Sequence, residues 1–293
     1  MLKRIIAPTI AVLMALACAG CAQEAPPATV VTTAPTTQTT TPPTTEPPPP
    51  ETTVPPEPDT VSILDFLTTA TQPVGSTMYV WGGGWNEEDT GAGIEAVTLG
   101  LPSQWAAFAD EQDAYYDHKE TRYQIHDGLD CSGYIGWAVY NTLETSDGRP
   151  GYVCSSTKMA QQLSDRGLGE YIPAERVTHW VPGDIMSMSG HCWIVVGMCD
   201  DGSVLLLHAS PPGVMFSGTT APDGSSTQAT ALAEQIMAEH YPDWYTRYPH
   251  SARPYSYLTQ SSALRWSDVM LDDKEGLRQM SAQEVVQLLF PAD

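Results

Sequence analysis

Apolar residues recur at intervals of three and four along several stretches of the chain, which is the spacing of one helix face. This spacing predicts helices over the ranges 62–69, 103–116, 132–143, 227–240 and 281–290. Asp130 stands at the N-cap position of the third helix, because a short acidic side chain accepts hydrogen bonds from the N–H groups at a helix start. Cys131 then lies in the first turn. The last helix is amphipathic, and we expect it to pack on the domain.

Two continuous apolar runs, 192–198 and 204–207, flank an Asp-Asp-Gly turn and predict an antiparallel hairpin. His191 begins the first strand and His208 ends the second. The two histidines share one face of the sheet if the loop holds an even number of residues. A two-residue turn would leave them about 13 Å apart at about 3.3 Å per residue. Direct pairing of the two histidines needs a loop centred between Cys199 and Asp200, so we expect a loop of four residues or more. A final strand is expected over 263–266.

The composition describes an acidic protein. The 293 residues include 13 Lys and Arg against 35 Asp and Glu, a net charge of −22. This balance argues against nucleic acid as a partner, because phosphate binding needs clustered basic residues, and against a polybasic mode of membrane binding. Six cysteines are too few for a disulfide-held miniprotein. Beyond the N-terminus, no apolar run reaches the roughly 20 residues of a membrane-spanning helix.

The first 20 residues have the pattern of an export signal. Lys3 and Arg4 precede an apolar stretch over 5–17, and small residues precede Cys21. This order resembles a bacterial lipoprotein signal, in which the cysteine carries the lipid. We therefore expect the protein to be exported and anchored to a bacterial membrane at the cell envelope. The departure is Cys18, where such signals usually have Leu; cleavage before Cys18 and simple secretion are the alternatives.

Residues 21–60 form a segment rich in Pro and Thr. Twelve Pro and thirteen Thr occupy positions 22–60, which contain no Lys, Arg or aromatic residue. Such a composition cannot form a core and predicts a disordered tether. It would span about 120 Å fully extended at about 3.1 Å per residue. The globular domain is expected over 61–293.

Cys131, His191 and His208 together have the residue types of a cysteine nucleophile. A helix start favours the thiolate, while Asp130 opposes it. One imidazole takes the thiol proton and a second polar group orients that imidazole. For Cys131 the alternative is a buried structural cysteine, and for the histidines an ordinary structural role.

Other cysteine chemistry receives less support from the sequence. We expect no metal and no cofactor, because neighbouring strand residues point to opposite faces and there is no Cys-x-x-Cys pair. A disulfide from Cys154 to Cys192 or Cys199 stays open. A bridge between Cys192 and Cys199 is disfavoured, because they emerge on opposite faces of one strand.

Four motifs in order resemble the NlpC/P60 cysteine peptidases. They are Tyr79-Val-Trp-Gly-Gly, Leu129-Asp-Cys-Ser-Gly-Tyr, Val181-Pro-Gly-Asp-Ile and the two histidine strands, and they cover about 62–217. The resemblance implies an α+β, papain-like fold, with the cysteine helix packed on a small antiparallel sheet. It also implies that Cys131 is the nucleophile, His191 the general base and acid, and His208 the orienting residue.

The resemblance further implies a substrate. Family members cut bacterial cell-wall stem peptides after γ-D-glutamate, before diaminopimelate or lysine. In members that prefer a free N-terminus, the positions of Tyr79, Asp130 and Ser132 shape the amine-side pocket. A carboxylate and hydroxyls suit a protonated amine. We expect peptidoglycan stem peptides as partners, the membrane through the lipid, and a monomer.

Two insertions, at about 86–127 and 225–260, depart from the family pattern and could form walls of the substrate-binding groove. Three other functions are weighed against the endopeptidase. They are a thiol-dependent N-acetylmuramoyl-L-alanine amidase, an acyl- or peptidyl-transferase on the same fold, and a non-catalytic lipid-anchored surface binding protein.

Overall fold

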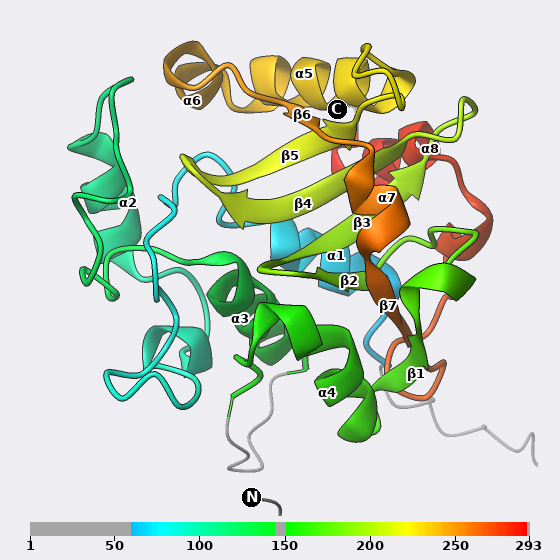
Figure 1. Cartoon of the computed structure of the whole chain (residues 1–293), viewed down its shortest axis with the longest axis horizontal. Helices are drawn as coiled ribbons and strands as arrows, with labels where there is room; N and C mark the ends of the chain where they lie inside the picture. Colours follow the sequence, from blue (N-terminus) through cyan, green and yellow to red (C-terminus); the bar gives the residue numbers. More distant parts are fainter. Residues whose placement is uncertain (1–59, 144–150, 292–293) are drawn as a thin grey trace, which may run out of the picture. The chain divides into compact units, whose positions relative to one another are not determined.

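A seven-stranded sheet organises the protein, which we describe from a computed structural model over residues 60–143 and 151–291 (Figure 1). The strand order is β1-β7-β2-β3-β4-β5-β6, and every neighbouring pair is antiparallel except β5 and β6. The fold is therefore a mixed α+β fold, as predicted. The strands are β1 (Gly169–Ile172), β2 (Ile185–Met188), β3 (His191–Met198), β4 (Val204–Ser210), β5 (Gly213–Thr219), β6 (Ala252–Arg253) and β7 (Ser262–Trp266).

Helices cover both faces of the sheet. The larger core joins α1, α3, α5 and α8 to one face, and a smaller cluster under α7 covers the other. Coverage of both faces explains why the central strands are continuous apolar runs. The α-helices are α1 (Ile63–Thr71), α2 (Ser103–Asp110), α3 (Cys131–Leu143), α4 (Met159–Asp165), α5 (Gln228–His240), α6 (Pro242–Arg247), α7 (Ser256–Gln260) and α8 (Ala282–Leu289).

The predicted helices are present, and capping side chains set several of their starts. Ser62, Thr227 and Ser281 cap α1, α5 and α8, and each accepts a hydrogen bond from the backbone N–H three residues later. The prediction over 103–116 was wrong in length, because α2 ends at Asp110. Beyond it the chain turns, and the Tyr116 hydroxyl donates to the backbone carbonyl of Tyr79 at 2.8 Å.

The β3–β4 hairpin has a five-residue loop, 199–203, which fits the predicted length of four or more. The register places Ile194 opposite Leu207, and then shifts at a β-bulge between Val195 and Gly197. The bulge adds one residue to β3, which restores the shared face of His191 and His208 despite the odd loop. The histidines are diagonal neighbours across the two strands and are not directly opposed.

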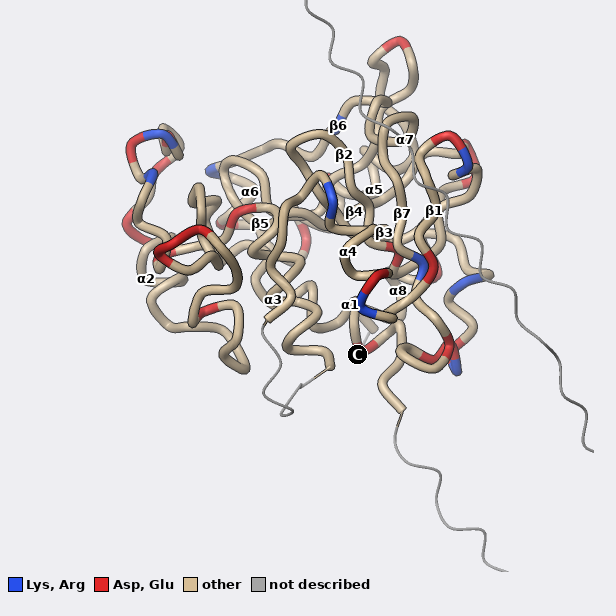
Figure 2. Tube along the Cα trace, turned by 60° about the horizontal axis from the view of Figure 1, so that its bottom comes forward, with Lys and Arg blue, Asp and Glu red and all other residues tan. Residues whose placement is uncertain are grey.

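The export signal, Cys21 and most of the tether lie outside the described residues. Within the described part of the chain, no helix is long and apolar enough to cross a bilayer. Acidic residues are spread over the loops of this part, while Lys and Arg are few (Figure 2).

Candidate active site

Cys131 is the first residue of α3, and Asp130 organises this helix start. One carboxylate oxygen of Asp130 accepts hydrogen bonds from the Gly133 N–H at 2.7 Å and the Ser132 hydroxyl at 2.8 Å. The other accepts from the Gly82 N–H at 3.2 Å. The predicted N-cap role is therefore present, and the same side chain ties α3 to the triple-glycine turn.

The glycines of that turn allow close approach between two backbones. A Cβ on Gly133 would collide with the carbonyl oxygen of Gly83, and a Cβ on Gly83 would collide with Gly128. The triple glycine therefore brings the turn against the first turn of α3, where it stands beside Cys131.

The two histidines contact each other next to Cys131. His191 Nε2 lies 3.0 Å from His208 Nδ1, and their rings are 5.3 Å apart at 80°. Diagonal neighbours on adjacent strands are within reach of such side chains. The interaction with His191 is one of the causes that lower the pKa of the Cys131 thiol, so the histidine pair lies beside Cys131. The three predicted residues are thus brought together.

Arg253 holds the His208 ring in this array, and sequence reasoning missed it. Its Nε–H donates to His208 Nε2 at 3.1 Å, and the Ser217 hydroxyl lies 3.1 Å from the same nitrogen. Both groups therefore hold the ring through the nitrogen that does not face His191, while Nδ1 faces His191. Burial and then the Arg253 charge hold the pKa of His208 well below its ordinary value, which keeps the ring neutral.

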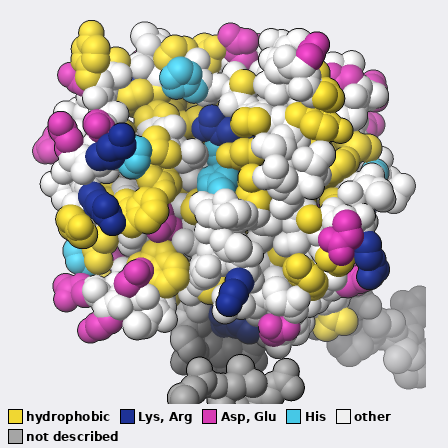
Figure 3. Space-filling model, in the orientation of Figure 1, with side chains coloured by type: hydrophobic (Ala, Val, Ile, Leu, Met, Phe, Trp, Pro, Cys, Tyr) yellow, Lys and Arg dark blue, Asp and Glu magenta, His cyan; other side chains and the backbone are white. Residues whose placement is uncertain are grey.

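Arg253 is half-buried and lies beside the fully buried His208. It makes no ion pair with a carboxylate in the described part of the chain; its other contacts are the Ala252 carbonyl and Met215 Sδ. The ring of Tyr257, on α7, lies 5.5 Å from that of His191 and covers the same face. Both residues lie in the 225–260 segment, which therefore contributes contacts to the two histidines. In Figure 3 a basic side chain lies next to a histidine near the centre of the face.

Cys192 is a second residue that the sequence analysis did not place in the site. Its side chain is fully buried and donates a hydrogen bond to Cys131. This hydrogen bond, opposed by burial and assisted by His191, holds the pKa of the Cys131 thiol well below its ordinary value. Burial and the neighbouring Cys131 raise the pKa of Cys192, so it stays a thiol and a donor. Cys131 is therefore the reactive member of the pair.

Cys131 opens into a cleft of about 350 Å³, which we call the inner cleft. Tyr79, Asp130 and Ser132 line it, as expected for positions that face a substrate. Burial raises the pKa of Asp130 to about 7, with the charge of Cys131 as the next cause. Burial also raises the pKa of Tyr79 well above its ordinary value, so its phenol stays protonated.

Other chemistry at this position finds no support in the described residues. No three of their His, Cys, Asp and Glu side chains are grouped so that they could hold a metal ion. Cys131, Cys154, Cys192 and Cys199 are all free thiols. The bridges left open for Cys154 are therefore absent here, and its sulfur contacts Met159 Sδ at 3.2 Å.

Comparison with known proteins found no matching family model, no matching curated protein and no matching solved structure.

Proposed function

We propose that this protein is a cysteine peptidase that cuts cell-wall stem peptides after γ-D-glutamate. The observation that carries the proposal is the convergence of Cys131, His191 and His208 at one cleft, with the pKa of the cysteine thiol lowered. A low-pKa thiol next to an imidazole that is itself oriented by a second group is the arrangement of a nucleophilic catalyst.

The reaction proceeds in two displacements. The Cys131 thiolate forms a bond to the carbonyl carbon of the scissile peptide, and the carbon–nitrogen bond breaks as His191 gives a proton to the leaving amine. Water then attacks the thioester with His191 taking its proton, which releases the γ-glutamyl acid and restores the thiolate. The backbone N–H of Cys131, at a helix start, is suited to hold the oxyanion.

The arrangement of elements agrees with a papain-like fold of the NlpC/P60 type. The cysteine begins α3, and α3 packs against β3 and β4, the strands that carry the histidines. On this proposal the substrate class comes from the resemblance, and the lipid at Cys21 with its tether would hold the enzyme near the wall.

The test is digestion of purified peptidoglycan and defined stem peptides, with mass spectrometry of the fragments. An endopeptidase releases fragments that begin with the diamino acid, whereas an amidase separates sugar from the intact stem. No release by the wild-type protein under any of these conditions would favour a binding protein. Added amine acceptors that appear in the product would indicate a transferase.

Variants of the two histidines test the assigned roles. His191→Ala removes the proton donor and acceptor and should abolish turnover. His208→Ala leaves that group in place and should lower kcat less. Equal losses of turnover in both variants would contradict these different roles of His191 and His208.

A further inference from the structure

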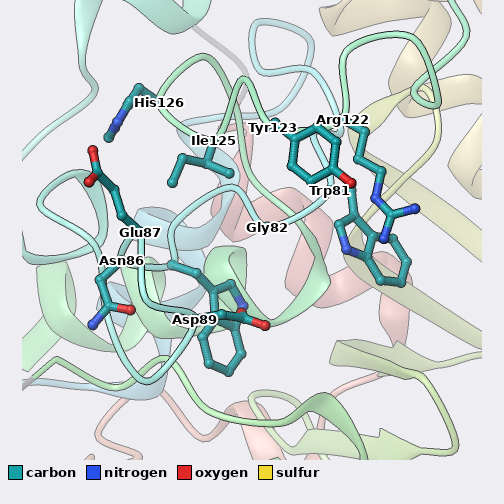
Figure 4. Close-up of a pocket in the computed structure, with 10 residues that line it drawn as sticks. Trp81, Gly82, Asn86, Glu87, Asp89, Arg122, Tyr123, Ile125 and His126 are labelled. Carbon is teal, nitrogen blue, oxygen red and sulfur yellow. The ribbon is translucent and has the colours of Figure 1, made fainter.

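A second hollow continues from the inner cleft into the 86–127 insertion. We call it the outer pocket; its volume is about 470 Å³ (Figure 4). The two hollows share four lining residues, Trp81, Gly82, Trp85 and Asp89. A ligand bound in the inner cleft can therefore extend into the outer pocket. The rest of its wall includes Arg122 and Tyr123, which the insertion supplies.

The end of the inner cleft is poorly suited to a free amino terminus. The Asp130 carboxylate already accepts three hydrogen bonds, from Gly82, Ser132 and Gly133. The Ser132 hydroxyl donates to Asp130 and accepts from the indole N–H of Trp85 at 3.0 Å. An ammonium group needs acceptors that are not already used. Asp130 and Ser132 are therefore largely engaged within the protein, and the substrate chain can continue past these residues.

The wall of the outer pocket presents aromatic surface to solvent. Trp81 is 54% exposed and Tyr123 is 79% exposed, and the Arg122 guanidinium lies 5.5 Å and 5.4 Å from their ring centroids. Figure 4 shows Arg122 beside both rings, with Asn86 and Glu87 on the opposite side of the pocket. Arg122 makes no hydrogen bond or ion pair with any described residue, so its N–H groups are available to a ligand.

The backbone holds this wall in an uncommon conformation. Tyr123 has φ 87° and Asp89 has φ 56°, and these are the two non-glycine residues with positive φ in the described chain. Both line the outer pocket. A bulky residue at positive φ costs free energy, and such residues cluster at ligand sites. The conformation therefore points to a ligand that uses the exposed ring of Tyr123.

We propose that the outer pocket binds the amino sugar to which the amino end of the stem peptide is attached. The inference rests on the proposed function, and it means that the substrate is a glycan-linked stem and not a free peptide. A sugar ring offers apolar faces to Trp81 and Tyr123, while its hydroxyl and acetamido groups suit the mixed charges of Asp89 and Arg122. The sugar lies on the amine side of the stem, beyond the positions of Asp130 and Ser132.

The kinetic test compares one stem peptide in two forms, linked to the N-acetylglucosaminyl-N-acetylmuramoyl disaccharide or carrying a free amino terminus. We expect the wild-type protein to cut the linked form with the higher kcat/KM. Tyr123→Ala and Arg122→Gln should reduce this preference, by about fivefold to tenfold for the loss of one aromatic contact. Tyr115→Ala is the matched control, because Tyr115 is an exposed tyrosine of the same insertion outside both hollows.

The binding test uses the disaccharide alone with the Cys131→Ala protein, followed by tryptophan fluorescence. Saturable binding that weakens in Tyr123→Ala and not in Tyr115→Ala supports the inference even if neither peptide is cut, a result that would overturn only the proposed function. Equal cutting of both peptides, a preference for the free amino terminus, or no disaccharide binding would overturn the inference and leave the peptidase intact.

Discussion

Replacement of Cys192 by alanine tests the origin of the reactive thiol. Cys192 is fully buried and donates its hydrogen bond to Cys131, which is the largest cause of the lowered thiol pKa. Cys192→Ala removes the donor and leaves the histidine pair in place. The Cys131 thiolate loses stabilisation, so its pKa must rise.

The size of the effect follows from the strength of one hydrogen bond to a charged group. Such bonds contribute about 1.5–3 kcal/mol, and a thiol is a weak donor, so the lower end applies. One pKa unit corresponds to about 1.4 kcal/mol. We therefore expect the pKa of Cys131 to rise by about one unit in Cys192→Ala, and to return most of the way in Cys192→Ser, whose hydroxyl can donate.

The assay is the rate of iodoacetamide alkylation as a function of pH, with the modified cysteine identified by peptide mass spectrometry. Mapping separates Cys131 from the other thiols, and the midpoint of its profile gives the pKa. A midpoint in Cys192→Ala within about 0.3 units of the wild type, with folding intact by circular dichroism, would refute the reasoning, because 0.3 units is only about 0.4 kcal/mol.

Three further predictions concern the surroundings of the nucleophile. Arg253→Gln removes the charged donor that holds the His208 ring, so kcat should fall about tenfold with KM little changed and with an altered pH profile. Arg253→Lys should recover part of the loss, and an unchanged pH profile would mean that Arg253 is only structural. Gly133→Ala should lower Tm by roughly 4–10 °C, because the added Cβ would collide with the backbone of Gly83. Gly91→Ala is the control, because its Cβ has room, and it should leave Tm unchanged. Equal Tm values in the two variants would contradict the close contact between the backbones of Gly83 and Gly133. Because the pKa of Cys131 is lowered, kcat/KM should rise with pH through a midpoint well below the ordinary thiol value; a midpoint near pH 9 would count against a thiolate at neutral pH.

Local patterns predicted the parts of the site that depend on neighbours in sequence. The spacing of apolar residues and the cap at Asp130 were enough to put Cys131 in the first turn of a helix. This feature depends on the helix period, which a single sequence carries. Alternation along the two apolar runs puts His191 and His208 on one face only for an even loop, and with the five-residue loop the bulge in β3 restores that face.

The remaining parts depend on contacts between distant segments. Arg253 reaches His208 only because β6 pairs in parallel with the end of β5, a long-range pairing with no local signal. The bulge near Val196, which makes the histidines diagonal neighbours, leaves no composition cue. Cys192 was visible beside His191, but its contact with Cys131 depends on how α3 meets β3.

The most direct measurement for the central claim is the rate of fragment release from defined stem peptides by Cys131→Ala, beside Cys154→Ala as a control thiol. Both cysteines are free, but only Cys131 contacts His191. We predict that Cys131→Ala, folded as the wild type, releases nothing above background, while Cys154→Ala keeps the wild-type rate. Release by Cys131→Ala at a measurable fraction of the wild-type rate would contradict the role of Cys131 as nucleophile.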